Sequence, residues 1–335
     1  MDRASARRVA VVSGPAGSPV AAALGRGARA VPAIVRTIRR RGPVREAAAA
    51  IRRANEAAVV VVYHRIATRQ RPRYEIVPTV PRELFRRQLE VFADLGRVVP
   101  LRSVIEARED AGPRFALTFD DDLGSHVGEA LPILRERGMH GTFFLSGRAL
   151  HGLDGYWFER LEAFVRERGV SGTASALGVS AASEMELARA CEADPRARAV
   201  LADLAPRVET SLDATGIGAL VSTGMHIGFH TLHHPVLTSL DDDALRASLT
   251  DGRDALQALA GTALAWFAYP HGKADARIVS AVRAAGFTDA WTTAPHVAAP
   301  DDDAFLRGRW DPLPVSIDHM VLRLARLIAS PSGSS

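Results

Sequence analysis

Two short polar segments in the middle of the chain carry residue types that could bind a metal. One contains three consecutive aspartates, residues 120–122, and the other contains His230, His233 and His234. One carboxylate and two imidazoles make a zinc-type ligand set that leaves a coordination position open. Such a centre can activate water for hydrolysis. The sequence therefore predicts a metal-dependent deacylase.

The spacing of the histidines leaves one alternative open. His230 and His234 are four residues apart, which places their rings on the same side of a helical turn. His233, three residues after His230, is a geometric rival to His234. Surface imidazoles and a solvated aspartate turn with a helix cap are the common alternatives to a metal site. Because both segments follow apolar runs of one alternating pattern, their combination favours the metal site.

The elements that must position these residues alternate between strands and helices. Apolar runs predict strands at 57–63, 115–119, 141–145, 225–229, 265–269 and 288–293. A 3.6-residue pattern predicts helices at 81–95, 127–137, 241–260 and 275–285. Repeated strand–helix units indicate a parallel α/β sheet, either doubly wound or closed as a barrel. Catalytic groups in such folds gather at the carboxyl ends of strands. His64, Asp120, His230 and His271 all lie at or just beyond predicted strand ends.

The chain is expected to have two parts. Residues 1–56 are predicted to form a basic helical extension, and residues 57–330 a catalytic domain with a helical insertion at about 156–220, where strand patterns disappear. Between residues 28 and 53, arginines alternate with apolar residues at helical spacing around a break at Gly42-Pro43. This pattern indicates a basic surface helix pair or, alternatively, a peripheral contact with an anionic membrane or a partner.

Composition excludes several classes of protein. The 335 residues are 47% hydrophobic and 24% charged, which suits a large folded core. The net charge of +4 comes from interspersed acids and bases, so we expect no nucleic-acid partner. Cys191 is the only cysteine, which excludes an intramolecular disulfide and fits a reducing compartment. Because no signal peptide or membrane span is recognisable, we expect a cytoplasmic protein, with membrane association as an alternative.

The order of the motifs resembles the NodB-homology polysaccharide deacetylases, carbohydrate esterase family 4. The resemblance extends from about Val59 to Trp310 and rests on four motifs, which are YHRI at 63–66, TFDD at 118–121, HTLHHP at 230–235 and FAYPHG at 267–272. It implies a distorted (β/α) barrel. It also implies that Asp120 is the catalytic base and that Asp121, His230 and His234 ligate the metal, with His233 outside the ligand set.

The sequence departs from the family pattern at three positions. Ala268 stands where many members carry an arginine that holds the base, and Arg309 resembles an arginine found on a later strand of some members. We expect Arg309 to pair with Asp120; the alternative is a surface arginine. The late motif that usually supplies the general acid is absent, and His64 is preferred for that role over His271 and His319. Asp122 replaces a common glycine and is expected to take its unusual backbone angle.

The sequence thus predicts a hydrolase that removes an acetyl, or alternatively a formyl, group from an amino sugar. The expected partner is an acylated amino sugar in a nucleotide-linked, lipid-linked or small glycoside form. Zinc (Zn²⁺) is the expected metal, with Co²⁺, Ni²⁺ or Mn²⁺ as alternatives. An O-acetyl esterase, a deformylase and a non-catalytic carbohydrate-binding module are the alternative functions. Tyr156, Trp157 and Trp291 are interpreted either as core residues or as platforms for a sugar ring.

Overall fold

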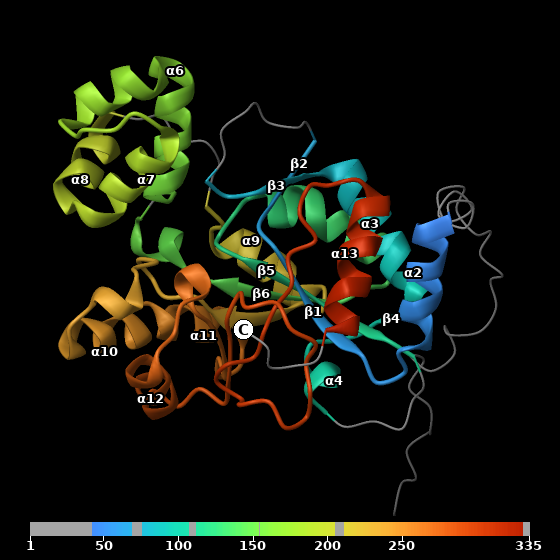
Figure 1. Cartoon of the computed structure of the whole chain (residues 1–335). Coiled ribbons are helices and arrows are strands. Elements are labelled where there is room, and N and C mark those ends of the chain that lie inside the picture. The colour runs from blue at the N-terminus through green and yellow to red at the C-terminus, as the bar shows by residue number, and fades with distance from the viewer. Residues whose placement is uncertain (1–41, 69–75, 107–111, 154, 205–210, 331–335) are drawn as a thin grey trace, which may run out of the picture. The chain divides into compact units, whose positions relative to one another are not determined.

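The computed structural model describes residues 42–68, 76–106, 112–153, 155–204 and 211–330 (Figure 1). All of them belong to one compact unit. Most of the extension predicted at residues 1–56 therefore lies outside the described residues. Within the described part of the chain, every helix is too short or too polar to cross a lipid bilayer.

A parallel sheet forms the centre of the fold. Its strands lie in the order β1 (Ala58–Tyr63), β5 (Arg114–Asp120), β6 (Gly141–Leu145), β7 (His226–Phe229), β8 (Trp266–Ala268) and β9 (Asp289–Trp291), with β4 (Arg97–Val98) also beside β5. All residues of β1, β5 and β6 are buried. Parallel strands covered on both faces read as continuous apolar runs, which is why the sequence located these strands well.

The segment Arg307–Trp310 connects the two ends of the sheet. The backbone N–H of Arg307 donates to the carbonyl of Ala290 in β9, and that of Trp310 donates to the carbonyl of Val60 in β1. The segment thus forms one β-bridge with β9 and one with β1, and it runs parallel to the strand in both. The sheet therefore curls into the distorted (β/α) barrel, which confirms the predicted fold class.

Helices cover the sheet, and a small parallel pair of strands, β2 (Arg65–Ala67) and β3 (Thr79–Pro81), lies beside it. The helices are α2 (Gly42–Arg53), α3 (Arg82–Leu95), α4 (Arg102–Ile105), α5 (Leu131–Glu136), α6 (Trp157–Leu177), α7 (Glu184–Ala193), α8 (Pro195–Leu204), α9 (Ala214–Ser222), α10 (Asp242–Thr250), α11 (Arg253–Ala260), α12 (Ala276–Ala284) and α13 (Ile317–Ala329). The single helix predicted at 241–260 is wrong in one respect, because it is divided into α10 and α11. Gly252 interrupts it with a φ of 78°, a left-handed angle that glycine adopts easily.

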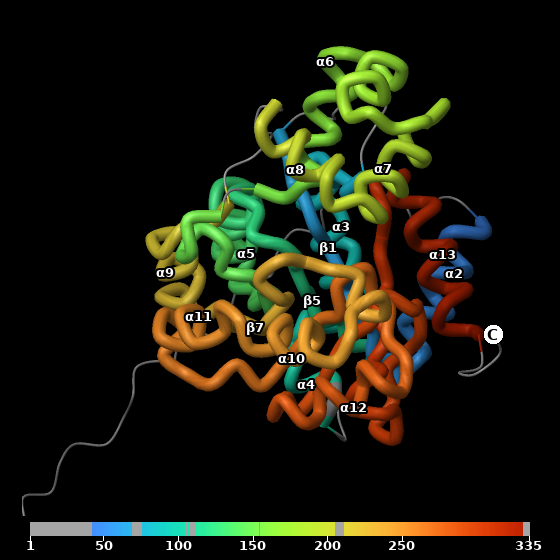
Figure 2. Tube along the Cα trace, turned by 90° about the vertical axis from the view of Figure 1, so that its left-hand side faces the viewer, coloured from blue at the N-terminus to red at the C-terminus, as the bar shows by residue number. Residues whose placement is uncertain are grey.

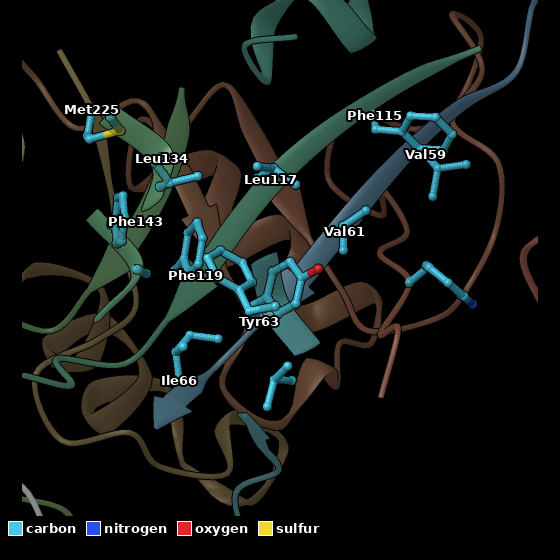
Figure 3. Close-up of a cluster of buried hydrophobic side chains, with 14 of the residues drawn as sticks. Val59, Val61, Tyr63, Ile66, Phe115, Leu117, Phe119, Leu134, Phe143 and Met225 are labelled. Carbon is cyan, nitrogen blue, oxygen red and sulfur yellow. The ribbon is translucent and has the colours of Figure 1, made fainter. Parts of the chain in front are cut away.

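Aromatic side chains anchor the strands just before the site. The ring of Phe119 in β5 stacks on that of Phe143 in β6 at 4.5 Å between centroids, and on that of Tyr63 in β1 at 5.6 Å (Figure 3). The Tyr63 hydroxyl also donates a hydrogen bond to Gln88 of α3. Such ring pairs add to the stabilisation that burial alone supplies. They fix the ends of three strands from which polar side chains then emerge.

The helical region predicted at about 156–220 divides into two parts. Helices α6, α7 and α8 share an apolar cluster of their own and lie together beside the barrel in both views (Figures 1 and 2). Helix α9 instead buries Ile217 and Leu220 in the main core, next to α11. The insertion therefore comprises residues 157–204, and α9 is a barrel helix. The sequence shows that a segment is helical but not which surface it covers.

Helix α2 belongs to the barrel rather than to a separate extension. Its side chains Val44, Ala48 and Ile51 are buried in the main core, and the helix lies against α13 and α3 (Figure 2). The apolar face of α2 is therefore covered by the protein itself. The peripheral contact suggested for residues 28–53 stays a prediction, and most of that segment lies outside the described residues.

Candidate active site

Strand register brings the candidate residues to one edge of the barrel. Tyr63 of β1 pairs with Phe119 of β5, so His64 and Asp120 follow at the same level. The backbone N–H of His230, the residue after β7, donates to Leu145 at the end of β6. Carboxyl ends of parallel strands share one edge, which is where such folds place their catalytic groups.

Asp121, His230 and His234 converge on one point. Oδ1 of Asp121 is 3.8 Å from Nε2 of His230 and 3.7 Å from Nε2 of His234. One ligand atom from each of the three residues lies within 4.8 Å of the others. These separations suit three ligands around one ion with bonds of about 2 Å. His233 is exposed and is not part of this cluster.

The backbone of β8 orients the first histidine. Nδ1 of His230 donates a hydrogen bond of 2.8 Å to the carbonyl of Ala268. The proton on Nδ1 leaves the lone pair of Nε2 free to face Asp121, which is the usual arrangement for a ligating imidazole. Ala268, which stands where an arginine was expected, thus contributes to the site through its main chain.

The donor set fits a divalent cation. Oδ1 of Asp121 is buried and has no hydrogen-bond partner among the described residues. Burial, followed by the neighbouring charge of Asp120, raises the pKa of Asp121 well above its usual value. A buried carboxylate without a partner is unfavourable, and a cation bound there would compensate for it. Two imidazoles and one carboxylate are ligands typical of zinc and similar ions.

Strained backbone occurs at several residues of the site. Asp121, Thr231, His234 and His271 have φ angles of 72°, 62°, 50° and 60°. Residues with side chains rarely adopt such angles unless the surrounding structure imposes them. The expectation that Asp122 takes an unusual angle is wrong, because the positive φ falls one residue earlier, on Asp121.

Asp122 has a different role from the one expected. Its two carboxylate oxygens accept hydrogen bonds from the backbone N–H groups of Ser146, at 2.7 Å, and Arg148, at 2.9 Å. Its own N–H donates to the hydroxyl of Tyr156, which also contacts the Ser146 hydroxyl. Asp122 therefore holds the loop that follows β6.

Arg309 donates two parallel hydrogen bonds to the carboxylate of Asp120. Its Nη1 and Nη2 donate to the two carboxylate oxygens at 2.6 and 2.7 Å, and its Nε donates to the carbonyl of Thr292. Burial raises the pKa of Asp120, but the charge of Arg309, the charge of His230 and the hydrogen bonds from Arg309 together outweigh burial and lower this pKa to about 2. Asp120 is thus ionised and lies beside the ligand cluster without joining it.

Of the three candidates for the general acid, two line the cavity at the ligand cluster. His64 is half-buried there, burial lowers its pKa, and the charges of Asp120 and Asp311 oppose this effect. Its carbonyl accepts a hydrogen bond of 3.1 Å from Nε2 of His126. His271 also lines the cavity, whereas His319 is exposed on α13 and does not.

The cavity at the ligand cluster measures about 320 Å³ and receives one wall from the insertion. Sequence reasoning missed this wall, whose α7 residues include Arg189 and Glu192. The helical pattern of α7 gave no signal that one of its faces meets a site built from distant strands. Among the aromatic candidates, Trp157 lines the cavity, while Tyr156 and Trp291 are buried.

The comparisons with known proteins agree with this geometry. The sequence profile of the polysaccharide deacetylase family matches residues 107–290, more than half of the chain. The chain belongs to this family. It is therefore a deacetylase, and the resemblance predicted from its motifs is confirmed. No curated protein sequence matches the chain.

Several solved structures of deacetylases have a similar fold. The Streptococcus pyogenes deacetylase PplD, in complex with acetate, shares 18% identity with a TM-score of 0.56, over 80% of this chain and 97% of that one. IcaB from Ammonifex degensii shares 20% identity with a TM-score of 0.52, over 82% and 97%. BC0361, a polysaccharide deacetylase from Bacillus cereus, shares 15% identity with a TM-score of 0.54, over 82% and 69%. At these identities the likeness concerns the fold.

Proposed function

We propose that this deacetylase removes an N-acetyl group from an amino sugar, with a divalent metal, most simply Zn²⁺, held by Asp121, His230 and His234. One observation carries the proposal. The three ligand atoms converge within 4.8 Å, next to an ionised Asp120 that Arg309 keeps out of the ligand set. Neighbouring carboxylates in different environments can thus divide the roles of ligand and base.

Asp120 is the residue that accepts a proton from the attacking water. It is fully ionised at neutral pH, because its pKa is about 2, and a carboxylate of this pKa is a weak base. A bound divalent metal would polarise the acyl carbonyl and lower the pKa of a water molecule, which suits a weak base. The bidentate contact with Arg309 fixes the direction in which Asp120 faces the cavity.

His64 is the residue that protonates the leaving group. As the oxygen of water bonds to the acyl carbon and the carbon–nitrogen bond breaks, the amine nitrogen needs a proton, and His64 lies in the same cavity as Asp120. Because burial lowers the pKa of His64, its imidazole is neutral before the reaction, and it passes to the amine a proton that it has first taken up. The proton that leaves the attacking water is the source, so the proton count balances. The products are acetate and the free amine.

The replacement Asp120→Asn tests this function. The variant should lose about 10²- to 10⁴-fold in kcat on acetylated glucosamine oligomers, since the asparagine cannot accept a proton. Its content of bound zinc should not change, because Asp120 is not a ligand. Release of free amine and of acetate measures the reaction, and Asp301→Asn, an exposed aspartate outside the site, is the control.

Two outcomes would contradict the proposal in different ways. Full activity in the Asp120→Asn variant would remove Asp120 from the role of base. A wild-type protein that binds zinc and an amino sugar but releases no acetate or formate from N- or O-acylated sugars would be a carbohydrate-binding module. Parallel assays on N-acetyl, N-formyl and O-acetyl sugars distinguish the deacetylase from the deformylase and the esterase.

A further inference from the structure

We propose that a second cavity, which His234 also lines and Asp120 does not, binds an anionic group that the acylated sugar carries, either a phosphoryl group or a carboxylate. This inference rests on the proposed function, because it describes the remainder of the same substrate. It assigns a task to residues of the insertion and of the loop after β6 that the hydrolysis itself does not use.

The second cavity adjoins the first. It measures about 360 Å³ and shares four lining residues with the cavity at the ligand cluster. These shared residues are Trp157, Glu192, His234 and His271. The metal ligand His234 thus borders both cavities. A substrate whose acyl group reaches Asp121 can extend past the rings of His234 and Trp157 into the second cavity.

A fixed arginine from the barrel faces this second cavity. Nε of Arg148 donates to the carbonyl of Gly155 at 3.1 Å, and its Nη1 donates to the carbonyl of Leu232 at 2.9 Å. The guanidinium also lies over the ring of Tyr156, 4.8 Å from its centroid. Among the described residues, no acceptor engages its Nη2. Asp122 holds the backbone of Arg148, so this side chain starts from an anchored loop.

A second arginine comes from the insertion. Nη1 of Arg198 in α8 donates to the carbonyls of Cys191, at 2.8 Å, and Glu192, at 2.6 Å, at the end of α7. Its other nitrogens have no acceptor among the described residues. Two pre-positioned guanidinium groups have lost much of their conformational freedom before a ligand arrives. They are well suited to the paired oxygens of a phosphoryl group or carboxylate.

The charge around the second cavity favours an anion over a neutral sugar ring. Glu192 is the only carboxylate among the described residues that line it, and its Oε1 is 3.7 Å from Nδ1 of His271. The exposed His233 adds a further hydrogen-bond donor to the same cavity. A neutral sugar would need acceptors as well as donors for its hydroxyl groups. Two arginines and one carboxylate that faces an imidazole provide mainly donors.

The test compares a charged and an uncharged substrate. N-acetylglucosamine 1-phosphate and methyl N-acetylglucosaminide carry the same acyl group, so only the phosphoryl group differs. We expect Arg148→Gln and Arg198→Gln each to raise KM for the phosphorylated sugar about tenfold or more, since each loses a charge-assisted hydrogen bond. KM for the uncharged glycoside should change less than about twofold. Arg246→Gln, an exposed arginine of α10 outside both cavities, is the matched control.

The outcomes separate this inference from the proposed function. If the wild-type protein hydrolyses both sugars and the arginine variants affect both equally or neither, the anion subsite is wrong and the deacetylase function stands. If the wild-type protein hydrolyses neither sugar, titration calorimetry with N-acetylglucosamine 1-phosphate shows whether the second cavity binds this sugar. Binding that both variants lose supports the subsite without the function, and absence of binding overturns it.

Two controls complete the experiment. Because Arg148 and Arg198 also bind backbone carbonyls, each variant must retain the wild-type circular dichroism spectrum, and His233→Gln provides a milder change in the same cavity. A disaccharide that joins N-acetylglucosamine to a uronic acid distinguishes the two anions. A selective loss for this disaccharide assigns the cavity to a carboxylate, and a selective loss for the sugar phosphate assigns it to a phosphoryl group.

Discussion

The adjacent carboxylates of Asp120 and Asp121 differ in pKa because their neighbours differ. Asp120 and Asp121 are both buried, yet the pKa of Asp120 falls to about 2 and that of Asp121 rises well above its usual value. The guanidinium of Arg309 stabilises the charge on Asp120. Asp121 has no such cation among the described residues, and its oxygen faces two imidazoles instead. The two carboxylates therefore differ in pKa because Asp120 faces a guanidinium and Asp121 faces imidazoles.

We expect Asp121→Asn and His230→Gln each to abolish binding of one zinc ion per chain. Each change removes one of only three protein ligands, and two remaining ligands bind zinc weakly. His233→Ala should bind zinc normally, because His233 lies outside the cluster. Metal content after dialysis and the rise in Tm on adding zinc measure the effect. Equal loss in all three variants would contradict the ligand assignment.

We expect Arg309→Met to impair both stability and catalysis. It leaves Asp120 as a buried charge without its cation, which costs about 3–5 kcal/mol of unfolding free energy. The pKa of Asp120 should also rise. As the pH is lowered, kcat of the variant should therefore begin to fall at a higher pH than kcat of the wild-type protein. Urea denaturation and the pH profile of kcat measure these effects.

A matched control for Arg309→Met is available in the same segment. Arg307→Met breaks the pair that Arg307 forms with Asp289 at 2.8 Å, outside the site. It should lower stability while leaving the pH profile of kcat unchanged. If both variants gave the same profile, Arg309 would have only a structural role.

At the scale of elements, the strands were easier to predict than the arrangement of the helices. The strand expected at 141–145 coincides with β6, because both faces of this strand are covered and its sequence is apolar throughout. The helix expected at 241–260 was not divided correctly, since Gly252 weakens the helical pattern only slightly. The positions of α2 and α9 in the barrel depend on long-range packing, which periodicity does not encode.

One buried network joins the insertion to the barrel. Arg65 of β2 lies 3.0 Å from Oε2 of Glu162 and 3.4 Å from Oε1 of Glu159, both on α6. Glu162 also accepts the backbone N–H groups of Ile76 and Val77, which line the cavity at the ligand cluster. This network therefore ties α6 of the insertion to the segment of Ile76 and Val77, which forms part of the cavity wall.

We expect Arg65→Met to loosen the insertion while the barrel stays folded. The change leaves two buried carboxylates without this cation, which is strongly unfavourable. Limited proteolysis should then cut within α6–α8 well before the barrel, and KM should rise more than kcat falls. Arg86→Met breaks an exposed pair with Glu136 and should change stability by less than about 1 kcal/mol. Unchanged proteolysis in Arg65→Met would show that apolar contacts alone hold the insertion.

For the molecule as a whole, the motifs indicated the cluster of candidate ligands but not the rest of the cavity. The positions of Asp121 and His230 after predicted strands pointed to a metal site, while His234 was chosen over His233 only through the resemblance of the motif order to a known family. Glu192 and Arg198 could not, since they lie on amphipathic helices whose polar faces look like ordinary surface. Only the folded chain shows that these faces meet the site. The proposed anion subsite therefore lies in the part of the fold that sequence patterns describe least well.

The stability of the whole molecule should fall in acid partly through His126. Burial lowers the pKa of His126 from 6.5 to about 3, and its ring packs against Phe119 and Phe143. The unfolded chain binds a proton at this residue below about pH 6.5, and the folded chain does not. The imidazole is therefore neutral in the fold, and stability is lost as the pH falls from about 6.5 towards 3, by at most about 1.4 kcal/mol per pH unit.

His126→Gln tests this pH dependence without removing a side-chain donor towards the carbonyl of His64. Urea denaturation between pH 7 and 4, with metal chelated, gives the free energy of unfolding at each pH. This free energy should change less steeply with pH in the variant than in the wild-type protein, by an amount that corresponds to up to one proton. His319→Gln, at an exposed position on α13, is the control for the replacement of a histidine by glutamine. An unchanged slope in His126→Gln would mean that His126 is protonated within the fold. In that case the hydrogen bond to His64 would not depend on a neutral imidazole.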